Sequence, residues 1–373
     1  MTWVFWAASV LIVYAYLGYP LWLWVRSWLR PWPVRTGGNE PSVSVVMVVR
    51  NEEGVLARKV ENLLTLDYPA ERLEVVVVSD GSTDRTEAIL HECARHPRVQ
   101  AVLNQLSKGK ASGLNDALQF AHGEIVIFTD ARQTIEPAAP RVLLSNFADS
   151  QVGCVSGELM LGDPDAGEKS RGMGLYWRIE KTVRELESAS GSVVGATGAF
   201  YGVRRELLAP LPPETLLDDV YIPMQVARAG KRVVFEPRAR AWDLPDQGSG
   251  REFARKVRTL NGNYQLLQLA PWLLSGENPI RFEFISHKLL RLVVPFALVA
   301  ALIACAAVPH PFYRTALWLQ LAFYALSLAG MAGMRMGPLA RVGDAALTFV
   351  VLNSAAAVAF ANFVTGKKAV WTR

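Results

Sequence analysis

The sequence predicts an α/β domain built on a mostly parallel sheet with helices on both faces, plus transmembrane helices at both ends of the chain. Strand-like and helix-like segments alternate at close spacing between residues 42 and 129, which is typical of parallel sheets. Polar residues follow three of the strands where each strand ends. Long apolar segments near both termini reach the length needed to cross a bilayer.

Four apolar runs are expected to form strands: 42–49, 73–79, 99–104 and 124–129. The segments between them are expected to form helices: 52–66, 82–96 and 110–121. Ser82 or Thr83 is expected to cap the second helix, because a hydroxyl can accept from the free N–H groups of a first turn. The sequence has no G-x-G-x-x-G after the first strand and no P-loop, so the ordinary dinucleotide and triphosphate fingerprints are absent.

Residues 3–25 carry no charge and are long enough to span a bilayer. A signal peptide is the alternative interpretation. The length, the missing basic region at the start and the aromatic residues at both ends favour a retained anchor. We therefore expect a transmembrane anchor over 1–27, followed by a linker rich in Pro and Gly over 28–41.

Three further apolar segments are expected to be membrane helices: 289–308, 314–334 and 343–364. A buried helical subdomain is the alternative, but the number of such segments favours a membrane region over 289–373, preceded by an interfacial segment at 264–288. If all three cross, the tail with Lys367, Lys368 and Arg373 ends outside, against the positive-inside rule. A segment that is re-entrant or lies flat in the interface would remove this conflict.

The basic residues cluster where a membrane protein carries them, so the net charge of +5 does not indicate a nucleic-acid partner. Arg26, Arg30 and Arg35 follow the first span, which places the middle of the chain in the cytoplasm. Three cysteines lie far apart in the sequence: Cys93, Cys154 and Cys305. This spacing predicts no zinc site, redox pair or disulfide framework, and it fits a reduced compartment.

Three strands end in polar groups at what should be one edge of the sheet: Arg50-Asn51-Glu52, Asp80-Gly81-Ser82 and Asp130-Ala131-Arg132. Ligands of open α/β sheets bind at this carboxyl edge. A carboxylate there can accept from a base or ribose, or hold a divalent cation, and Lys108 and Lys110 can meet the charge of a diphosphate. Taken singly, the aspartates fit turn or capping roles and the lysines fit solvated surface. Convergence on one edge favours a ligand site.

Several motifs occur in an order that resembles one family: VVMVVRNEE, VVVVSDGSTDRT, GKASGLNDAL, IVIFTDAR, and the segments 196–207, 216–243 and 251–263. Together they resemble family 2 glycosyltransferases with the GT-A (nucleotide-diphospho-sugar transferase) fold, over roughly residues 42–263. The flanking spans are similar to those of the membrane-embedded members. The resemblance implies an inverting glycosyltransferase in the inner (plasma) membrane, with a cytoplasmic catalytic domain over 42–263.

The resemblance also implies roles on the donor side. Glu52 and Asp80 are expected to meet the base and ribose of a nucleotide, which family resemblance suggests is UDP. Lys110 is expected near the diphosphate. Asp130 falls at the first Asp of the D-x-D metal motif, which implies a Mg²⁺ or Mn²⁺ cofactor.

On the acceptor side, Asp219 matches the second member of an acidic pair that serves as catalytic base, with Asp218 beside it. A helix N-cap is the simpler interpretation of this pair. Gly198 falls in a small-residue loop beside the acceptor. Deprotonation of an acceptor hydroxyl by one carboxylate, on the side away from the leaving group, implies direct displacement with inversion.

Two departures from the family pattern stand out. The second Asp of D-x-D is Arg132, so either Asp130 holds the ion with other ligands and phosphate oxygens, or Arg132 takes over part of the charge neutralisation. The Q-x-x-R-W motif of processive synthases should fall at 255–259, where only Arg258 matches. The alternative for this stretch is a basic amphipathic helix on the membrane surface.

These features predict transfer of a sugar from a nucleoside diphosphate sugar to a membrane-associated acceptor such as a lipid-linked glycan or glycolipid. Two other hypotheses stay open at this point. One is a processive exopolysaccharide synthase, with polysaccharide-assembly partners. The other is an inactive scaffold subunit of an export complex, with Arg132 as a mark of lost activity.

Overall fold

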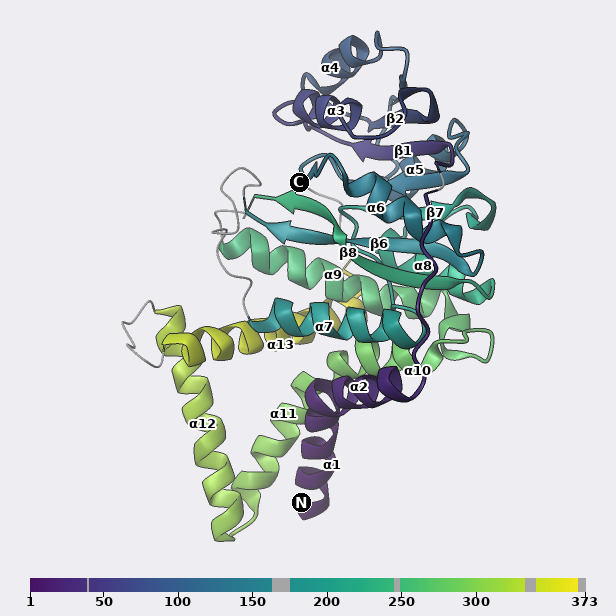
Figure 1. Ribbon diagram of the computed structural model, residues 1–373. Helices are drawn as coiled ribbons and strands as arrows, with labels where there is room; N and C mark the ends of the chain where they lie inside the picture. Colours follow the sequence, from purple (N-terminus) through teal and green to yellow (C-terminus); the bar gives the residue numbers. More distant parts are fainter. Residues whose placement is uncertain (39, 163–174, 245–248, 333–339, 368–373) are drawn as a thin grey trace.

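The computed structural model describes residues 1–38, 40–162, 175–244, 249–332 and 340–367. One mixed sheet with helices on both faces forms the larger part, called the sheet domain below (residues 43–269), and apolar helices extend from one side of it (Figure 1). The tail residues Lys368 and Arg373 lie outside the described residues.

The sheet has eight strands in the order β3-β2-β1-β4-β7-β6-β8-β5. The strands are β1 (Val43–Val49), β2 (Leu73–Asp80), β3 (Val99–Asn104), β4 (Ile125–Phe128), β5 (Thr134–Ile135), β6 (Val152–Leu161), β7 (Tyr201–Arg204) and β8 (Arg232–Asp243). The first four match the expected runs to within one residue at each end. They are mutually parallel, while β7 runs antiparallel to both β4 and β6.

Strand β1 lies between β2 and β4, and its register pairs Val49 with Ser79 and Val46 with Phe128. The carboxyl ends of these three strands therefore lie side by side, as the sequence predicts. Parallel strands covered on both faces have continuous apolar sequences, which explains why all seven residues of β1 are buried.

Helices cover both faces of the sheet. They are α3 (Leu56–Leu64), α4 (Thr86–Cys93), α5 (Lys110–Leu118), α6 (Ala139–Ser145), α7 (Leu175–Ser190), α8 (Asp218–Arg228) and α9 (Ser249–Leu269). Val46 and Val48 of β1 belong to a core that includes residues of α5 and α8. The alternate residues Val45 and Met47 belong to a second core with residues of α3, α4 and α6. This alternation is the side-chain period of a strand.

The prediction that Ser82 or Thr83 caps the second helix is wrong. Helix α4 begins at Thr86, and the Asp84 carboxylate accepts from the Thr86 N–H at 2.9 Å. The hydroxyl of Ser82 instead accepts from the Asn51 N–H at 3.2 Å, and the Thr83 N–H donates to the Asn51 side chain at 2.8 Å. The loops after β1 and β2 are thus hydrogen-bonded to each other. Both following helices therefore begin later in the sequence than predicted.

Among the described residues, three helices are long and apolar enough to cross a membrane: Thr2–Leu29, Arg281–Ala307 and Val342–Val364. The first comprises α1 (Thr2–Val13), a π-helical turn (Tyr14–Gly18) and α2 (Tyr19–Leu29). The second includes α10 (Arg281–Phe284), a π-helical turn (Ile285–Leu289) and α11 (Leu290–Ala307), and the third lies within α13 (Ala340–Val364). The predicted segment 314–334 corresponds to α12 (Pro311–Met331), whose Arg314 and Gln320 reduce its apolar character.

Figure 1 shows α1, α11 and α12 pointing away from the sheet, whereas α2 and α13 run along its underside near α7. Pro20 at the start of α2 and the preceding π-helical turn explain the change of direction, because both interrupt regular helical hydrogen bonding. Helix α2 packs against α7, and α13 packs against α9. The apolar helices are therefore joined firmly to the sheet domain.

The loop after β2 supplies a stability test. Gly81 has a φ of +62°, and a Cβ there would lie 2.5 Å from the Ser107 backbone nitrogen. We expect Gly81→Ala to lower the free energy of unfolding by about 1–3 kcal/mol, because the strained backbone and the neighbouring loop must both shift. Gly54→Ala is the control, since a Cβ at that position meets nothing within 4 Å. Equal thermal unfolding temperatures for the two variants would contradict this assignment.

Candidate active site

The Asp80 side chain organises the loop that precedes α5. It is fully buried, and its carboxylate accepts from the Ser107 hydroxyl at 2.7 Å and from the N–H groups of Lys108 and Gly109 at 2.8 and 3.0 Å. Gly109 has a φ of +92°, which lets the chain enter α5 directly from this loop. In this conformation the Asp80 oxygens bind the protein's own loop. Its predicted contact with a nucleotide stays a prediction.

Lys110 is the first residue of α5, and its ammonium group joins two acidic side chains. Its Nζ lies 2.9 Å from Asp130 Oδ1 and 3.2 Å from Asp218 Oδ1. Burial alone would lower the pKa of Lys110, but the two carboxylates outweigh burial and hold the pKa above its usual value. Lys110, Asp130 and Asp218 thus form one charged cluster, which joins the end of β4 to the starts of α5 and α8.

Asp219 lies beside this cluster. A Cβ on Gly198 would lie 3.3 Å from Asp219 Oδ2 and 3.8 Å from Asp130 Oδ2, so both carboxylates face the small residue between them. The Ala196 N–H donates to the Asp219 carbonyl at 2.7 Å, which fixes the small-residue loop against α8. Burial, and then the negative charge of Asp218, raise the pKa of Asp219 to about 6. A carboxylate tuned in this way is a better proton acceptor than an exposed one.

Two polar atoms in this region are buried without a partner among the described residues: Asp218 Oδ2 and the Tyr201 hydroxyl. The Tyr201 ring stacks on Phe128 at a centroid distance of 4.8 Å, at the end of β4. An unpaired buried oxygen costs free energy unless a ligand or water satisfies it. The Asp218 oxygen is therefore available to accept from a water or a bound group.

The oxygen donors suit a hard divalent cation, which takes carboxylate and phosphate oxygens. Within the described part of the chain, no group of three or more His, Cys, Asp or Glu residues forms a ready metal site. Asp130 and Asp219 can each offer an oxygen beside Gly198. They fit an ion whose remaining ligands come from the substrate.

Three other predicted site residues lie around this cluster. Glu52 is half-buried, and its N–H donates to the Thr86 hydroxyl at 2.8 Å. Arg132 is exposed and makes no ion pair with a described residue. Arg258 is half-buried on α9, with its Nε unpaired within the described ranges. Neither arginine is in ion-pair contact with the Lys110 cluster.

Helix α9 approaches the acidic pair through a glycine. A Cβ on Gly262 would lie 2.5 Å from Leu217 Cγ, so only glycine allows this close packing. The Gln265 side chain accepts from the Leu216 N–H at 3.0 Å. Arg258 is four residues before Gly262 and so lies on the same face of α9, which faces the start of α8.

The sequence analysis missed Lys59. This lysine is 2% exposed, and its Nζ donates to the Thr129 hydroxyl at 2.9 Å and to the Gln133 carbonyl at 2.7 Å. Burial lowers the pKa of Lys59 to about 7, against the nearby charge of Asp130. Through these two hydrogen bonds, the Lys59 side chain holds the segment that carries Asp130 in place. The sequence did contain a signal for a buried lysine, because Lys59 lies on the apolar face of α3 with Leu56, Val60 and Leu63.

Comparison with known proteins supports the fold described above. Residues 44–211 match the family described as Glycosyl transferase family 2. This stretch of the chain is thus similar to the family 2 glycosyltransferases. Poly-beta-1,6-N-acetyl-D-glucosamine synthases are similar in sequence: that of Staphylococcus epidermidis is 24% identical over 239 residues, which cover 62% of this chain and 56% of the relative. That of Staphylococcus aureus (strain MSSA476) is 24% identical over 234 residues, or 60% and 55% of the two chains. This chain thus aligns with little more than half the length of these relatives.

A mannosyltransferase from Pyrobaculum calidifontis, solved in complex with GDP-Man and Mn²⁺, is similar in structure. The TM-score is 0.73 with 24% sequence identity, and the match covers 97% of this chain and 99% of that chain. This likeness extends over the sheet domain and the apolar helices together. The expected GT-A fold is confirmed.

Proposed function

We propose that this protein transfers a sugar from a nucleoside diphosphate sugar to a membrane-associated acceptor, with inversion at the anomeric carbon. The observation that carries the proposal is the cluster in which Lys110 joins Asp130 and Asp218, with Asp219 and Gly198 beside it. Cations and a tuned carboxylate in one place are what this reaction requires.

The donor's diphosphate is expected to lie against the cationic side of the cluster. As the bond between the anomeric carbon and the diphosphate oxygen breaks, negative charge grows on the leaving group. Lys110 is fixed by its carboxylate partners and needs no rearrangement to stabilise that charge. Arg132 is exposed and can turn toward the phosphates. The face of α9 that carries Arg258 supplies a further cation.

The acceptor hydroxyl loses its proton to Asp219 as its oxygen attacks the anomeric carbon. The carboxylate of Asp219 lies beside Gly198, where even a methyl side chain would crowd it. Asp218 is tied to Lys110 and keeps one oxygen unpaired, so its role is to raise the basicity of Asp219 and to hold the cation in place.

A divalent ion, Mg²⁺ or Mn²⁺, would be held by Asp130, with Asp219 close by and phosphate oxygens of the donor completing the coordination. When bound, such an ion supplies charge neutralisation for the leaving diphosphate. The similar mannosyltransferase was solved with Mn²⁺, which supports this assignment.

The acceptor is expected to be a lipid-linked glycan or glycolipid, because apolar helices adjoin the sheet domain. A processive polysaccharide synthase is the second candidate, supported by the names of the relatives similar in sequence. The chain length of the product, determined by mass spectrometry after reaction in vesicles, separates single addition from polymerisation. The intact acidic cluster argues against the hypothesis that the protein is an inactive scaffold subunit.

We also propose that α1 with the π-helical turn that continues it (Thr2–Gly18), α11 and α12 cross the membrane, while α13 lies along its cytoplasmic face. Trp318, Leu319 and Met331 of α12 are each 68% exposed, as expected for side chains that face lipid. Phe363 of α13 stacks on Tyr264 of α9, with ring centroids 5.3 Å apart, which holds this helix against the sheet domain. The basic tail then stays in the cytoplasm, which removes the conflict with the positive-inside rule.

Replacement of Asp219 tests the base. We expect Asp219→Asn to lower kcat by about 10²–10⁴-fold, because the amide cannot accept the acceptor's proton. The wild-type rate should fall as the pH drops below about 6, where Asp219 becomes protonated. Asp218→Asn removes one cause of the raised pKa, so this acid limb should move to lower pH. Near-normal turnover by Asp219→Asn, or loss of nucleotide binding along with turnover, would refute the assignment.

Nucleotide and metal binding are tested together by thermal unfolding. By family resemblance we expect UDP with Mn²⁺ to stabilise the protein by about 2.7 kcal/mol relative to the ligand-free protein at a hundred times its dissociation constant, and GDP with Mn²⁺ to stabilise it less. A chelator should abolish both this stabilisation and activity. Addition of Mn²⁺ should not change the thermal stability of the Asp130→Ala variant. Full activity in chelator, with Arg132→Ala as damaging as Asp130→Ala, would transfer the role of the ion to arginine.

The proposed topology is tested with single cysteines in a variant whose native cysteines are replaced by alanine. A membrane-impermeant maleimide applied to right-side-out vesicles should label Pro309→Cys, in the turn between α11 and α12. It should label Lys367→Cys, after α13, only once the vesicles are opened. Labelling of Lys367→Cys in sealed vesicles would show that α13 crosses the membrane.

A further inference from the structure

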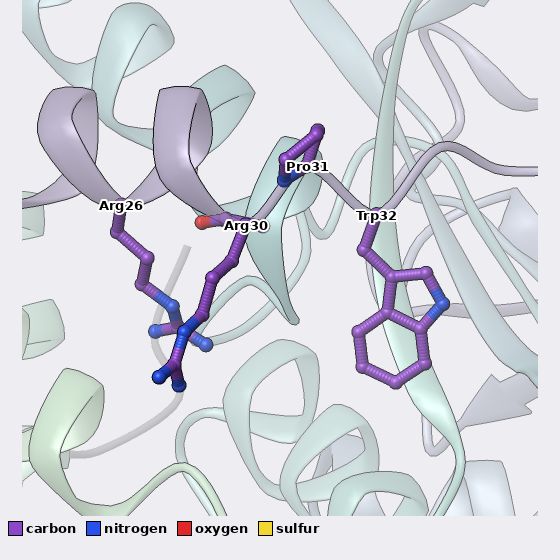
Figure 2. A pocket seen from close by; sticks show the side chains of 5 residues that line it. Arg26, Arg30, Pro31 and Trp32 are labelled. Carbon is purple, nitrogen blue, oxygen red and sulfur yellow. The ribbon is translucent and has the colours of Figure 1, made fainter.

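A pocket of about 350 Å³ lies where the first apolar helix ends, away from the acidic cluster. Its lining residues are Arg26, Arg30, Pro31, Trp32 and Ser190. Figure 2 shows the Arg26 and Arg30 side chains extending to the same side of the backbone, with the Trp32 ring next along the chain. This volume falls in the range of roughly 300–1,000 Å³ that is typical of small-ligand sites.

The pocket carries more positive than negative charge. Arg26 forms an ion pair with Glu283, while Arg30 has no side-chain partner within the described ranges. Behind the pocket, the Arg232 guanidinium lies 4.2 Å from the centre of the Trp32 ring, and its hydrogen bonds all go to backbone carbonyls. The charge of Asp149 offsets part of the Arg232 charge, so the unbalanced charge in the pocket is that of Arg30, which an anion would balance.

The surroundings place this charge at a membrane surface. Trp24 and Trp28 of α2 are 60% and 78% exposed, directly before the pocket, and Trp32 within it is 44% exposed. Exposed tryptophans beside basic residues at the end of an apolar helix are typical of the level of lipid headgroups. Basic side chains at this level attract the anionic lipids of the cytoplasmic leaflet.

We propose that this pocket binds the phosphodiester headgroup of an anionic membrane lipid. Arg26 and Arg30 donate to the phosphate oxygens, a geometry for which the planar guanidinium is well suited. The Trp32 ring packs against the glycerol part, and the acyl chains follow the apolar surface of α2. Free phosphate offers the same oxygens, but it would leave this aromatic and apolar surface uncovered.

The site would stabilise the junction between the apolar helices and the sheet domain. The Trp32 N–H donates to the Ala189 carbonyl of α7 at 2.8 Å, and the Arg26–Glu283 pair links α2 to α10. A Cβ on Gly191 would lie 2.8 Å from Arg26 Nη2, so the end of α7 approaches this arginine closely. A bound phosphate thus contacts residues that already connect three helices.

The experiment is native mass spectrometry of the full chain in detergent with phosphatidylglycerol or phosphatidylcholine. We expect selective retention of phosphatidylglycerol. Arg30→Gln should weaken this binding about five-fold, the effect expected for one basic side chain at an anionic surface. Arg30→Lys should weaken lipid binding less than Arg30→Gln does, because lysine keeps the positive charge. The matched control is Arg35→Gln, an exposed arginine of the same linker that does not line the pocket, and it should bind normally.

Three results would overturn the proposal. Equal retention of phosphatidylcholine would show that charge is not recognised. Equal weakening by Arg30→Gln and Arg35→Gln would indicate a general basic surface instead of a pocket. Displacement of the lipid by millimolar inorganic phosphate would assign the pocket to free phosphate. Thermal unfolding of Arg30→Gln without lipid should match the wild type, since this side chain has no partner to lose among the residues that the structure describes.

Discussion

The buried ammonium group of Lys110 is the interaction on which the candidate site depends. An isolated charge in such a position would be costly, and so would the carboxylates of Asp130 and Asp218 without a cation. Each group makes the burial of the others tolerable. Because Lys110 begins α5, Asp130 follows β4 and Asp218 begins α8, their pairing fixes three separate elements at one edge of the sheet. Removing one partner would leave an uncompensated charge instead of a simple gap.

The backbone at this edge supports the same arrangement. Gly81 allows the loop before α5 to pass close to the end of β2, and Asp80 then accepts three hydrogen bonds from that loop. Lys59 performs a similar task behind Asp130, through Thr129 and the Gln133 carbonyl. The residues that face a ligand are therefore held by polar groups buried one layer behind them, as preorganised sites require.

Sequence patterns predicted the strands well because a parallel strand covered on both faces must be apolar throughout, as β1 and β2 are. They predicted the convergence of Asp80 and Asp130 because parallel strands end at one edge. The direction of the Asp80 carboxylate could not be predicted, since its partners belong to a loop 27 residues further along. The cap at Ser82 failed for the same reason, as Asn51 of another loop competes for that hydroxyl. Hydropathy favours α13 over α12 as a membrane span, whereas the packing of α13 against α9 favours the opposite choice, because apolar side chains suit lipid and protein alike.

The charges at the edge of the sheet explain why an ion would arrive with the nucleotide. Asp130, Asp218 and Asp219 carry negative charge when ionised, and they are offset by Lys110, by the charge of Lys288 acting on Asp219 and by Arg132 two residues after Asp130, so neither sign dominates the site. Where a second aspartate would extend the metal motif, Arg132 removes a ligand and adds a cation. A divalent ion alone would therefore meet a weakly attractive site with few oxygens. A diphosphate alone would meet three carboxylates. Together they satisfy each other and the unpaired Asp218 oxygen, so we infer that donor and ion bind as one unit.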